Sequence, residues 1–445
     1  MSLDPELLAK ALARMAGGAA LPLSGLARLS GGANMESWSF DWGGAGYVLR
    51  RAPSAEMMAG RPFDHGVEAA LVRAARAAGV KAPEIVGELH ADDDLGTGYV
   101  MRRVEAEVSP AAILADPPAT LIDDIARELA AIHAMPADAV AGVPTMDTAA
   151  ALEELARRFE GYGGDRPILA LAIKWCRDHL PEPAALRLVH GDFRMGNLMA
   201  DANGLAAVLD WEIAHWGDAH EDLAYGCMTV WRFGHVEKPA FGCADLDRYF
   251  AAYEAAGGAP VDRDRFRFWL VYRTLWWALG CMQMGDIWRT GFDRSLERAV
   301  IGRRTSENEL DLLLLLEEDA PETQRLPIRL DPAPGARRQG EPSSAELLEA
   351  IREWIDADVK PQAQGRDRFM AAVAMNALGM LIREVENPVA PHDRALSDDL
   401  LAGRQTLATP GLLARLRKGA LAKLENDVPK YVALKVAKAR WLGAA

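Results

Sequence analysis

Two short polar motifs lie close together in the middle of the chain. In the first, Asp192 follows His190-Gly191, and Asn197 stands five positions after the aspartate. In the second, an apolar run ends in Asp210. Carboxylate and amide oxygens suit Mg²⁺, which takes few protein ligands and completes its octahedron with water and phosphate oxygens. These three side chains therefore predict a magnesium site, provided that the fold brings them together.

The residues between the two motifs predict how that happens. Asn203-Gly204 is a strong hairpin turn signal between two apolar runs. We expect a loop that leads into two short antiparallel strands, with Asp192, Asn197 and Asp210 at one end. The alternative is an ordinary polar loop in which Asp and Asn cap turns. His-Gly before the first aspartate and a strand before the second favour a functional site.

This order of residues resembles the aminoglycoside phosphotransferase and choline kinase-like family, whose members follow the protein-kinase plan. The family pattern is His-Gly-Asp-x-x-x-x-Asn followed by an apolar strand and Asp, matched here by His190, Gly191, Asp192, Asn197 and Asp210. The resemblance implies that Asp192 accepts the proton of the attacking hydroxyl, and that Asn197 and Asp210 hold Mg²⁺. It implies ATP as phosphoryl donor, with GTP left open. His190 is then a structural residue.

The N-terminal third matches the nucleotide-binding part of such a fold. Alternating strands around glycine turns predict an antiparallel meander, and Gly31 and Gly32 are expected to lie over the nucleotide phosphates. Arg50 stands where kinase-like enzymes carry a strand lysine, and arginine also grips phosphate. Its neighbour Arg51 should point to the opposite face of the strand. Arg50 is therefore the favoured phosphate ligand, with Arg51 left open.

Three further positions follow from the same resemblance. Glu68, on a helix expected over residues 63–78, resembles the glutamate that pairs with the strand cation. Met101 to Val104 would form the hinge whose backbone bonds the adenine edge. Beyond the second motif, Asp222 is expected to cap the following helix and to bond the catalytic loop from beneath.

Composition limits the class of protein. The chain has 445 residues, half of them hydrophobic, and a net charge of −14. That charge argues against sequence-independent nucleic-acid binding, which needs a basic surface. The four cysteines are scattered without a Cys-x-x-Cys pair, so free thiols are expected. No signal peptide or membrane span is predicted, and a cytoplasmic enzyme fits.

The expected fold class is α+β. We predict a bilobal kinase-like fold, with an antiparallel-sheet N-lobe over residues 1–105 and a mainly helical C-lobe over 106–325. A linker rich in Pro, Gly and Arg follows over 326–342. Amphipathic helices, including one over 398–406, predict an all-α domain of unknown role over 343–445. A homodimer through these helices is one expectation for that domain.

The predicted activity is transfer of a γ-phosphoryl group to a hydroxyl of a small molecule. The acidic composition would suit a cationic aminosugar or amino alcohol as acceptor. The Leu-Asp-Trp-Glu and Tyr-Val-Leu-Arg-Arg stretches instead resemble the branch fused in animals to acyl-CoA dehydrogenases. That resemblance implies a hydroxyacyl thioester or hydroxy acid, which we favour. The alternative class is a non-catalytic nucleotide-binding or scaffold protein, supported by arginine in place of the strand lysine.

Overall fold

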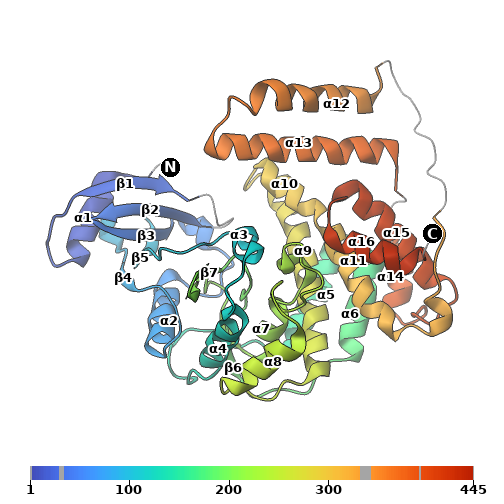
Figure 1. Cartoon of the computed structure of the whole chain (residues 1–445), viewed down its shortest axis with the longest axis horizontal. Helices are drawn as coiled ribbons and strands as arrows, with labels where there is room; N and C mark the ends of the chain where they lie inside the picture. Colours follow the sequence, from blue (N-terminus) through green and yellow to red (C-terminus); the bar gives the residue numbers. More distant parts are fainter. Residues whose placement is uncertain (1–2, 30–34, 331–341, 390–391, 444–445) are drawn as a thin grey trace. The chain divides into compact units, whose positions relative to one another are not determined.

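The computed structural model describes residues 3–29, 35–330, 342–389 and 392–443. The chain divides into two compact units (Figure 1). The first unit comprises residues 1–147 and 182–266, and the second comprises residues 148–181 and 267–445. The finer boundaries predicted at residues 105, 325 and 342 stay a prediction.

The first unit contains a five-stranded sheet, two short strand pairs and several helices. In chain order its elements are α1 (Pro5–Met15), β1 (Leu23–Arg28), β2 (Glu36–Trp42), β3 (Ala45–Ala52), α2 (His65–Ala77), β4 (Ile85–Glu88), β5 (Thr97–Arg102), α3 (Pro110–Ala115), α4 (Leu121–His133), β6 (Arg187–Val189), β7 (Leu198–Asp201), β8 (Gly204–Val208), β9 (His215–Gly217), α7 (His220–Tyr225) and α8 (Leu246–Ala255).

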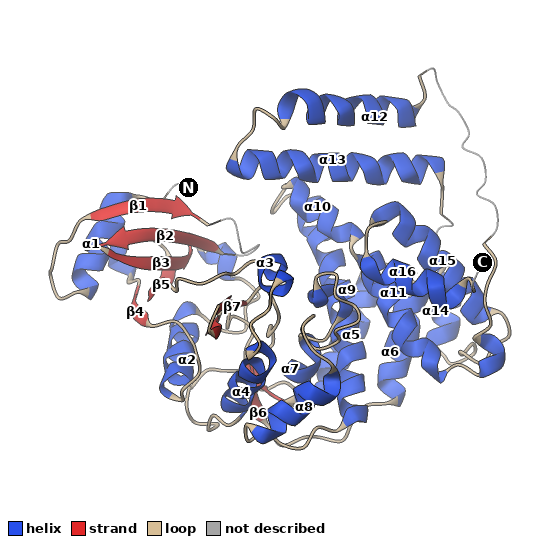
Figure 2. Ribbon diagram, in the orientation of Figure 1, coloured by secondary structure: helices blue, strands red, loops and turns tan. Residues whose placement is uncertain are grey.

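The predicted meander is an antiparallel sheet in the order β1-β2-β3-β5-β4 (Figure 2). Helix α1 starts at Pro5, because the Asp4 side chain accepts hydrogen bonds from the first-turn amides and a proline at this position needs no N–H donor. Its Leu8 and Leu12 side chains are fully buried and pack with Phe40 and Leu49 of the sheet. The sheet therefore has an apolar core on one face.

The residues between Asn197 and Asp210 form the predicted hairpin. β7 pairs antiparallel with β8 through Leu198 opposite Val208 and Asp201 opposite Gly204. The two turn residues are Ala202 and Asn203, one position before the predicted Asn203-Gly204, and Gly204 begins β8. A further backbone bond, from Leu209 N to Asn197 O at 2.8 Å, extends the pairing beyond the strands. This bond places the ends of both motifs next to each other.

The second unit is helical throughout its described part. Its helices are α5 (Thr148–Gly161), α6 (Pro167–Asp178), α9 (Arg263–Arg289), which begins in the first unit, α10 (Leu296–Arg303), α11 (Thr305–Leu316), α12 (Ser344–Trp354), α13 (Gly365–Glu386), α14 (Arg394–Leu401), α15 (Leu412–Asp427) and α16 (Val432–Trp441). Figure 1 shows α12 and α13 lying side by side as a helical hairpin.

One predicted helix was misplaced. The expected helix over 398–406 is α14, which spans Arg394–Leu401 and so begins and ends earlier. The reason is a cap, because the Asp393 side chain accepts from Leu396 N at 2.9 Å and starts the helix there. In the described part of the chain, no helix is both long and apolar enough to cross a membrane.

Candidate active site

Asp192 lies in the loop between β6 and β7, where two side chains of the same loop hold its carboxylate. Asn197 Nδ2 donates to Asp192 Oδ2 at 2.6 Å and to the Asp192 carbonyl at 2.9 Å. Arg194 Nε donates to Asp192 Oδ1 at 2.9 Å. The Arg194 guanidinium in turn lies 4.2 Å from the ring centroid of Trp231. The loop thus presents one oriented carboxylate with a cation beside it.

A buried carboxylate supports the backbone of this loop. Asp222 Oδ2 accepts from His190 N at 2.7 Å, and Asp222 Oδ1 accepts from Gly191 N at 2.9 Å. Burial alone would raise the pKa of Asp222, but hydrogen bonds from His133 and the loop amides lower it. The predicted contact with the catalytic loop is therefore confirmed. The predicted capping role is wrong, because α7 begins at His220 and Asp222 lies inside it.

Gly191 is required where the loop turns. Its φ angle is +81°, a conformation that L side chains rarely adopt. A Cβ at this position would also lie 2.8 Å from the carbonyl oxygen of Ile213. The glycine therefore allows the close approach that brings the loop next to the segment after Asp210.

His190 connects the loop to the hairpin. Its Nδ1 accepts from Asp192 N at 3.2 Å, and its Nε2 donates to the Leu209 carbonyl at 3.1 Å. Burial lowers the pKa of His190, so the imidazole is neutral and bridges two backbone groups. With the Leu209–Asn197 bond, this bridge brings Asp192, Asn197 and Asp210 to one end of the hairpin, as the sequence predicts.

Asp210 has a strained backbone and a partly exposed carboxylate. Its φ angle is +67°, and a non-glycine residue held in this region costs roughly 1–3 kcal/mol. The carboxylate accepts from Arg50 Nη2 at 2.7 Å, and its side chain is 25% exposed. The strained conformation thus turns an acidic group toward a cation of the N-terminal sheet.

Arg50, on β3, is surrounded by carboxylates. Its guanidinium contacts Asp210 and Glu212, and its Nε lies 3.3 Å from Glu68 Oε1 on α2. Burial opposes the charge of Arg50, but the carboxylates of Asp210 and Glu68 raise its pKa. The pairing of Arg50 with Glu68 predicted from the sequence is present in the structure.

Glu68 has a pKa that lies near neutral pH. Burial raises its pKa to about 7, and the Asp210 and Glu212 carboxylates act in the same direction, while Arg50 opposes them. Tyr99 Oη donates to Glu68 Oε1 at 3.0 Å. Glu68 can therefore take up a proton near neutral pH.

Arg51 points to the other face of the sheet, as predicted. It is buried and donates to Glu36 Oε2 at 2.9 Å and to the Leu95 carbonyl at 3.2 Å. Since Arg51 is paired away from the acidic cluster, Arg50 is the residue of this pair that lies with Asp210.

The remaining predicted nucleotide contacts are placed only in part. Gly31 and Gly32 lie outside the described residues. Met101 lies on β5, paired with Val48 of β3 and Ile85 of β4. Val104 lies beyond the end of β5, in the segment that leads toward α3. Their roles in binding adenine stay a prediction.

Comparison with known families identifies the class of protein. The model of the phosphotransferase enzyme family matches residues 25–269, more than half of the chain. The chain belongs to this family. The predicted resemblance is thereby confirmed, and so is the kinase-like α+β fold with its antiparallel N-terminal sheet and helical C-terminal region.

Curated relatives of this phosphotransferase include animal proteins of which it matches only a part. Acyl-CoA dehydrogenase family member 10 of Mus musculus is 25% identical over 254 residues, covering 51% of this chain and 23% of the relative. Acyl-CoA dehydrogenase family member 11 of Gallus gallus is 27% identical over 259 residues, covering 48% and 31%. The phosphotransferase thus spans less than a third of these two relatives. These relatives agree with the predicted resemblance to the branch fused in animals to acyl-CoA dehydrogenases.

A solved structure shares the fold. A candidate aminoglycoside phosphotransferase of Ralstonia eutropha JMP134 superposes with a TM-score of 0.54, at 22% identity, over 71% of this chain and 98% of its own. At that identity the likeness concerns the fold alone.

Three residues of the phosphotransferase site were not predicted from the sequence. Arg194 bonds Asp192, Glu212 contacts Arg50, and Arg61 Nη1 lies 2.7 Å from Glu212 Oε2. A signal existed for two of them, since Arg194 stands two positions after Asp192 and Glu212 two after Asp210. The sequence gives no signal for Arg61, because only the fold brings this residue to Glu212.

The donor set of the site fits Mg²⁺. Among the residues that the structure describes, no group of three or more His, Cys, Asp and Glu side chains could hold a metal ion by itself. Mg²⁺ needs no such group, because water and phosphate oxygens complete its shell. Asp210 offers a partly exposed carboxylate, and Asn197 an amide whose nitrogen is committed to Asp192, so that a cation would meet its oxygen.

Proposed function

We propose that this phosphotransferase moves the γ-phosphoryl group of ATP to a hydroxyl group of a small molecule. One observation carries the proposal. Asn197 bonds the Asp192 carboxylate through its side chain and Leu209 through its backbone, so that Asp192 and Asp210 lie at the same end of the β7–β8 hairpin. A proton acceptor and a metal ligand side by side are what transfer to a hydroxyl requires.

In the proposed reaction, Asp192 orients the acceptor hydroxyl and takes its proton. The hydroxyl oxygen forms a bond to the γ-phosphorus, the bond from that phosphorus to the β–γ bridging oxygen breaks, and ADP leaves with the bond's electron pair. Arg194, bonded to Asp192 at 2.9 Å, supplies a positive charge next to the transferred group. The chain's own contribution is positioning and charge neutralisation.

The donor half of the site rests on two further assignments. Asn197 and Asp210 would hold Mg²⁺, which neutralises phosphate charge when bound. Arg50 would neutralise the α- and β-phosphates, steadied by Glu68 at 3.3 Å. Met101 and Val104 would contact adenine through their backbone, and Gly31 and Gly32 would approach the phosphates. GTP as donor stays open.

For the acceptor, we favour a hydroxyacyl thioester or hydroxy acid over an aminoglycoside or amino alcohol. The support is the similarity to acyl-CoA dehydrogenase family members 10 and 11 over about half of this chain. The names of those relatives describe proteins that act on acyl thioesters, and fusion of two activities in one chain suits a shared class of substrate.

An acceptor screen tests the proposal. The full chain is incubated with ATP or GTP and Mg²⁺, ADP or GDP release is followed, and phosphorylated products are identified by mass spectrometry. The panel contains hydroxyacyl-CoAs, free hydroxy acids, aminoglycosides and amino alcohols. Asp192→Asn is the inactive control, and Asp201→Asn, at the exposed turn of the same hairpin, is its matched active control. If nucleotide binds but no acceptor is labelled, the non-catalytic scaffold function is the correct one.

Two other expectations stay predictions. A cytoplasmic location is tested by fractionation of the source cells. The homodimer would use α12, whose Leu347, Ile351 and Trp354 are each about half exposed on one helical face. Light scattering of the full chain and of Trp354→Glu, expected to be dimeric and monomeric respectively, tests it.

A further inference from the structure

The second unit contains a cavity of about 650 Å³ that the phosphotransferase reaction does not use. It lies among the starts of α6 and α14, helix α11, helix α15 and the segment that precedes α14. This volume is within the range of small-molecule binding sites. All of its lining residues belong to the second unit, so that the cavity is formed within one compact part of the chain.

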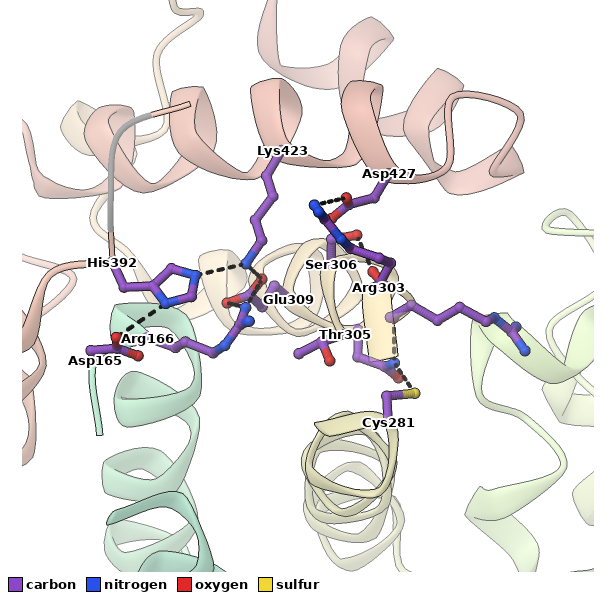
Figure 3. Close-up of polar contacts among 12 residues, drawn as sticks. Asp165, Arg166, Cys281, Arg303, Thr305, Ser306, Glu309, His392, Lys423 and Asp427 are labelled. Carbon is purple, nitrogen blue, oxygen red and sulfur yellow. Dashed lines mark hydrogen bonds and ion pairs between the residues drawn. The ribbon is translucent and has the colours of Figure 1, made fainter. Parts of the chain in front are cut away.

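One wall of the cavity is an ionic cluster in which Glu309 is buried and His392 and Asp165 are partly exposed (Figure 3). Arg166 Nη1 donates to both oxygens of Glu309, at 3.2 and 3.1 Å, and Lys423 Nζ donates to Glu309 Oε2 at 3.0 Å. His392 lies between Lys423 Nζ, at 3.4 Å, and Asp165 Oδ2, at 3.1 Å. In Figure 3 side chains from α11, from α15, from residues 165–166 and from the segment before α14 point toward one another.

Two cations share one carboxylate at the wall of the cavity. Arg166 and Lys423 both contact Glu309, at 3.1 and 3.0 Å. The second lining carboxylate, Asp393, is paired with Arg415. An anionic ligand would give Arg166 and Lys423 a second partner in addition to Glu309.

The protonation of the cluster follows from burial and from these contacts. Burial would raise the pKa of Glu309, but Lys423 and Arg166 lower it to about 2, so this carboxylate stays charged. Burial lowers the pKa of Lys423, Glu309 opposes this, and the positive charge of Arg166 acts in the same direction as burial. Burial also lowers the pKa of His392, helped by Arg166 and Lys423. An anion placed here would relieve the repulsion between these cations.

The rest of the lining is mostly apolar. Pro167, Ile168, Val389, Leu396 and Leu416 contribute hydrocarbon surface to the cavity. Charged groups at one side and hydrocarbon elsewhere are the arrangement expected for a ligand with a polar head and an apolar body. The start of α6 at this cavity adds partial positive charge.

From these observations we propose that the cavity between α6, α11, α14 and α15 binds a small amphiphile with one anionic head, a carboxylate or a phosphate, and an apolar chain. The head would lie against Lys423 and Arg166, and the chain along Ile168, Leu396 and Leu416. Such a site lies outside the residues that carry the phosphoryl transfer, so that binding and activity can be measured separately.

Calorimetry on the full chain, with four probes that share one chain length, tests the proposal. Octanoate and octyl phosphate carry the two anionic heads and so separate the two sources of negative charge. Octanol is the neutral control and octyltrimethylammonium the cationic one. We expect one or both anions to bind with one-to-one stoichiometry, at least tenfold more tightly than octanol and octyltrimethylammonium. Equal affinity for all four, or no binding by either anion, overturns the proposal.

A glycine in the cavity wall offers a variant that keeps the fold. Gly419 lies on α15, lines the cavity, and has no atom within 4 Å of the position of an added Cβ. Gly419→Leu should fill the cavity and reduce anion binding at least tenfold, with an unchanged or higher melting temperature. The matched control is Gly161→Leu, an exposed glycine of α5 with equally open surroundings that does not line the cavity. Binding by Gly419→Leu at the level of this control contradicts the site.

A second variant tests the head group. Lys423→Gln removes one cation while Arg166 still pairs with Glu309. We expect anion affinity to fall at least tenfold and the weak binding of octanol to stay unchanged. If octanol binding falls by the same factor, the variant has disturbed the cavity as a whole and the assigned role of Lys423 is wrong.

Discussion

Arg50 and Asp210 are 160 positions apart in the sequence, and Arg50 Nη2 donates to Asp210 Oδ1 at 2.7 Å. The bond joins strand β3 of the N-terminal sheet to the residue that follows the β7–β8 hairpin. It places the cation expected to reach the α- and β-phosphates beside the carboxylate expected to hold their metal ion. The donor half of the proposed site therefore depends on this pair.

The first prediction concerns Arg50. Arg50→Gln removes a buried charge that contacts three carboxylates. Since a hydrogen bond to a charged group contributes about 1.5–3 kcal/mol, the KM for ATP should rise roughly 10- to 100-fold. Arg28→Gln, at an exposed position of β1, is the control and should leave the KM unchanged. An Arg50→Gln enzyme with normal KM would assign phosphate binding to another cation.

The second prediction concerns the proton acceptor. Asp192→Asn keeps the shape of the side chain but cannot take the hydroxyl proton. Turnover should fall roughly 10²- to 10⁴-fold, because that is the usual contribution of a general base. ADP affinity, measured by calorimetry, should change little. Turnover equal to that of Asp201→Asn would remove Asp192 from its proposed role.

The third prediction concerns metal binding. Chelation with EDTA should abolish turnover, and added Mg²⁺ should restore it. In Asp210→Asn the Mg²⁺ concentration that gives half-maximal turnover should rise at least tenfold, because a neutral amide replaces an anionic ligand. The measurement is a Mg²⁺ titration of turnover at saturating ATP. An unchanged titration curve would show that Asp210 does not hold the ion.

The fourth prediction concerns the support beneath the catalytic loop. Both oxygens of Asp222 accept backbone N–H groups, at 2.7 and 2.9 Å, and an asparagine can offer only one oxygen. Asp222→Asn should therefore lower the free energy of unfolding by about 1–3 kcal/mol, because one buried N–H loses its acceptor. It should also lower kcat. Urea unfolding measures the first effect, with exposed Asp123→Asn on α4 as control.

The fifth prediction concerns pH. The folded pKa of Glu68, about 7, is higher than the ordinary value of 4.5, so the folded state binds the proton more tightly than the unfolded state. Between pH 4.5 and 7 the folded state carries more protons at this position, and its contribution to stability therefore decreases as pH rises. The full effect corresponds to about 3 kcal/mol.

Glu68→Gln should remove this contribution. The free energy of unfolding of the wild type minus that of Glu68→Gln should fall across this pH range. Titrating groups that do not interact with Glu68 are common to both proteins and cancel in this difference. Urea unfolding at several pH values measures it. A difference that stays constant from pH 4.5 to 7.5 would mean that Glu68 is ionised throughout.

Several features of this protein were determined by the sequence alone. The β7–β8 hairpin follows from Asn203-Gly204, and helix α1 from Asp4-Pro5, because each of these signals acts on backbone groups only a few positions away. The alternation of side chains along β3 likewise determined that Arg50 and Arg51 point to opposite faces. The motif around Asp192 was sufficient to indicate the family.

Only the tertiary structure decided which charges meet. Arg61 with Glu212, Arg194 over Trp231, and Lys423 with Glu309 are contacts between residues that no local pattern connects. The start of α14 depended on which of several candidate residues cap the helix, and Asp393 does so. The physical reason is the same in each case. A long-range ion pair or a cavity forms only after helices and strands have packed. The sequence contains the charged residues but does not show which of them come into contact.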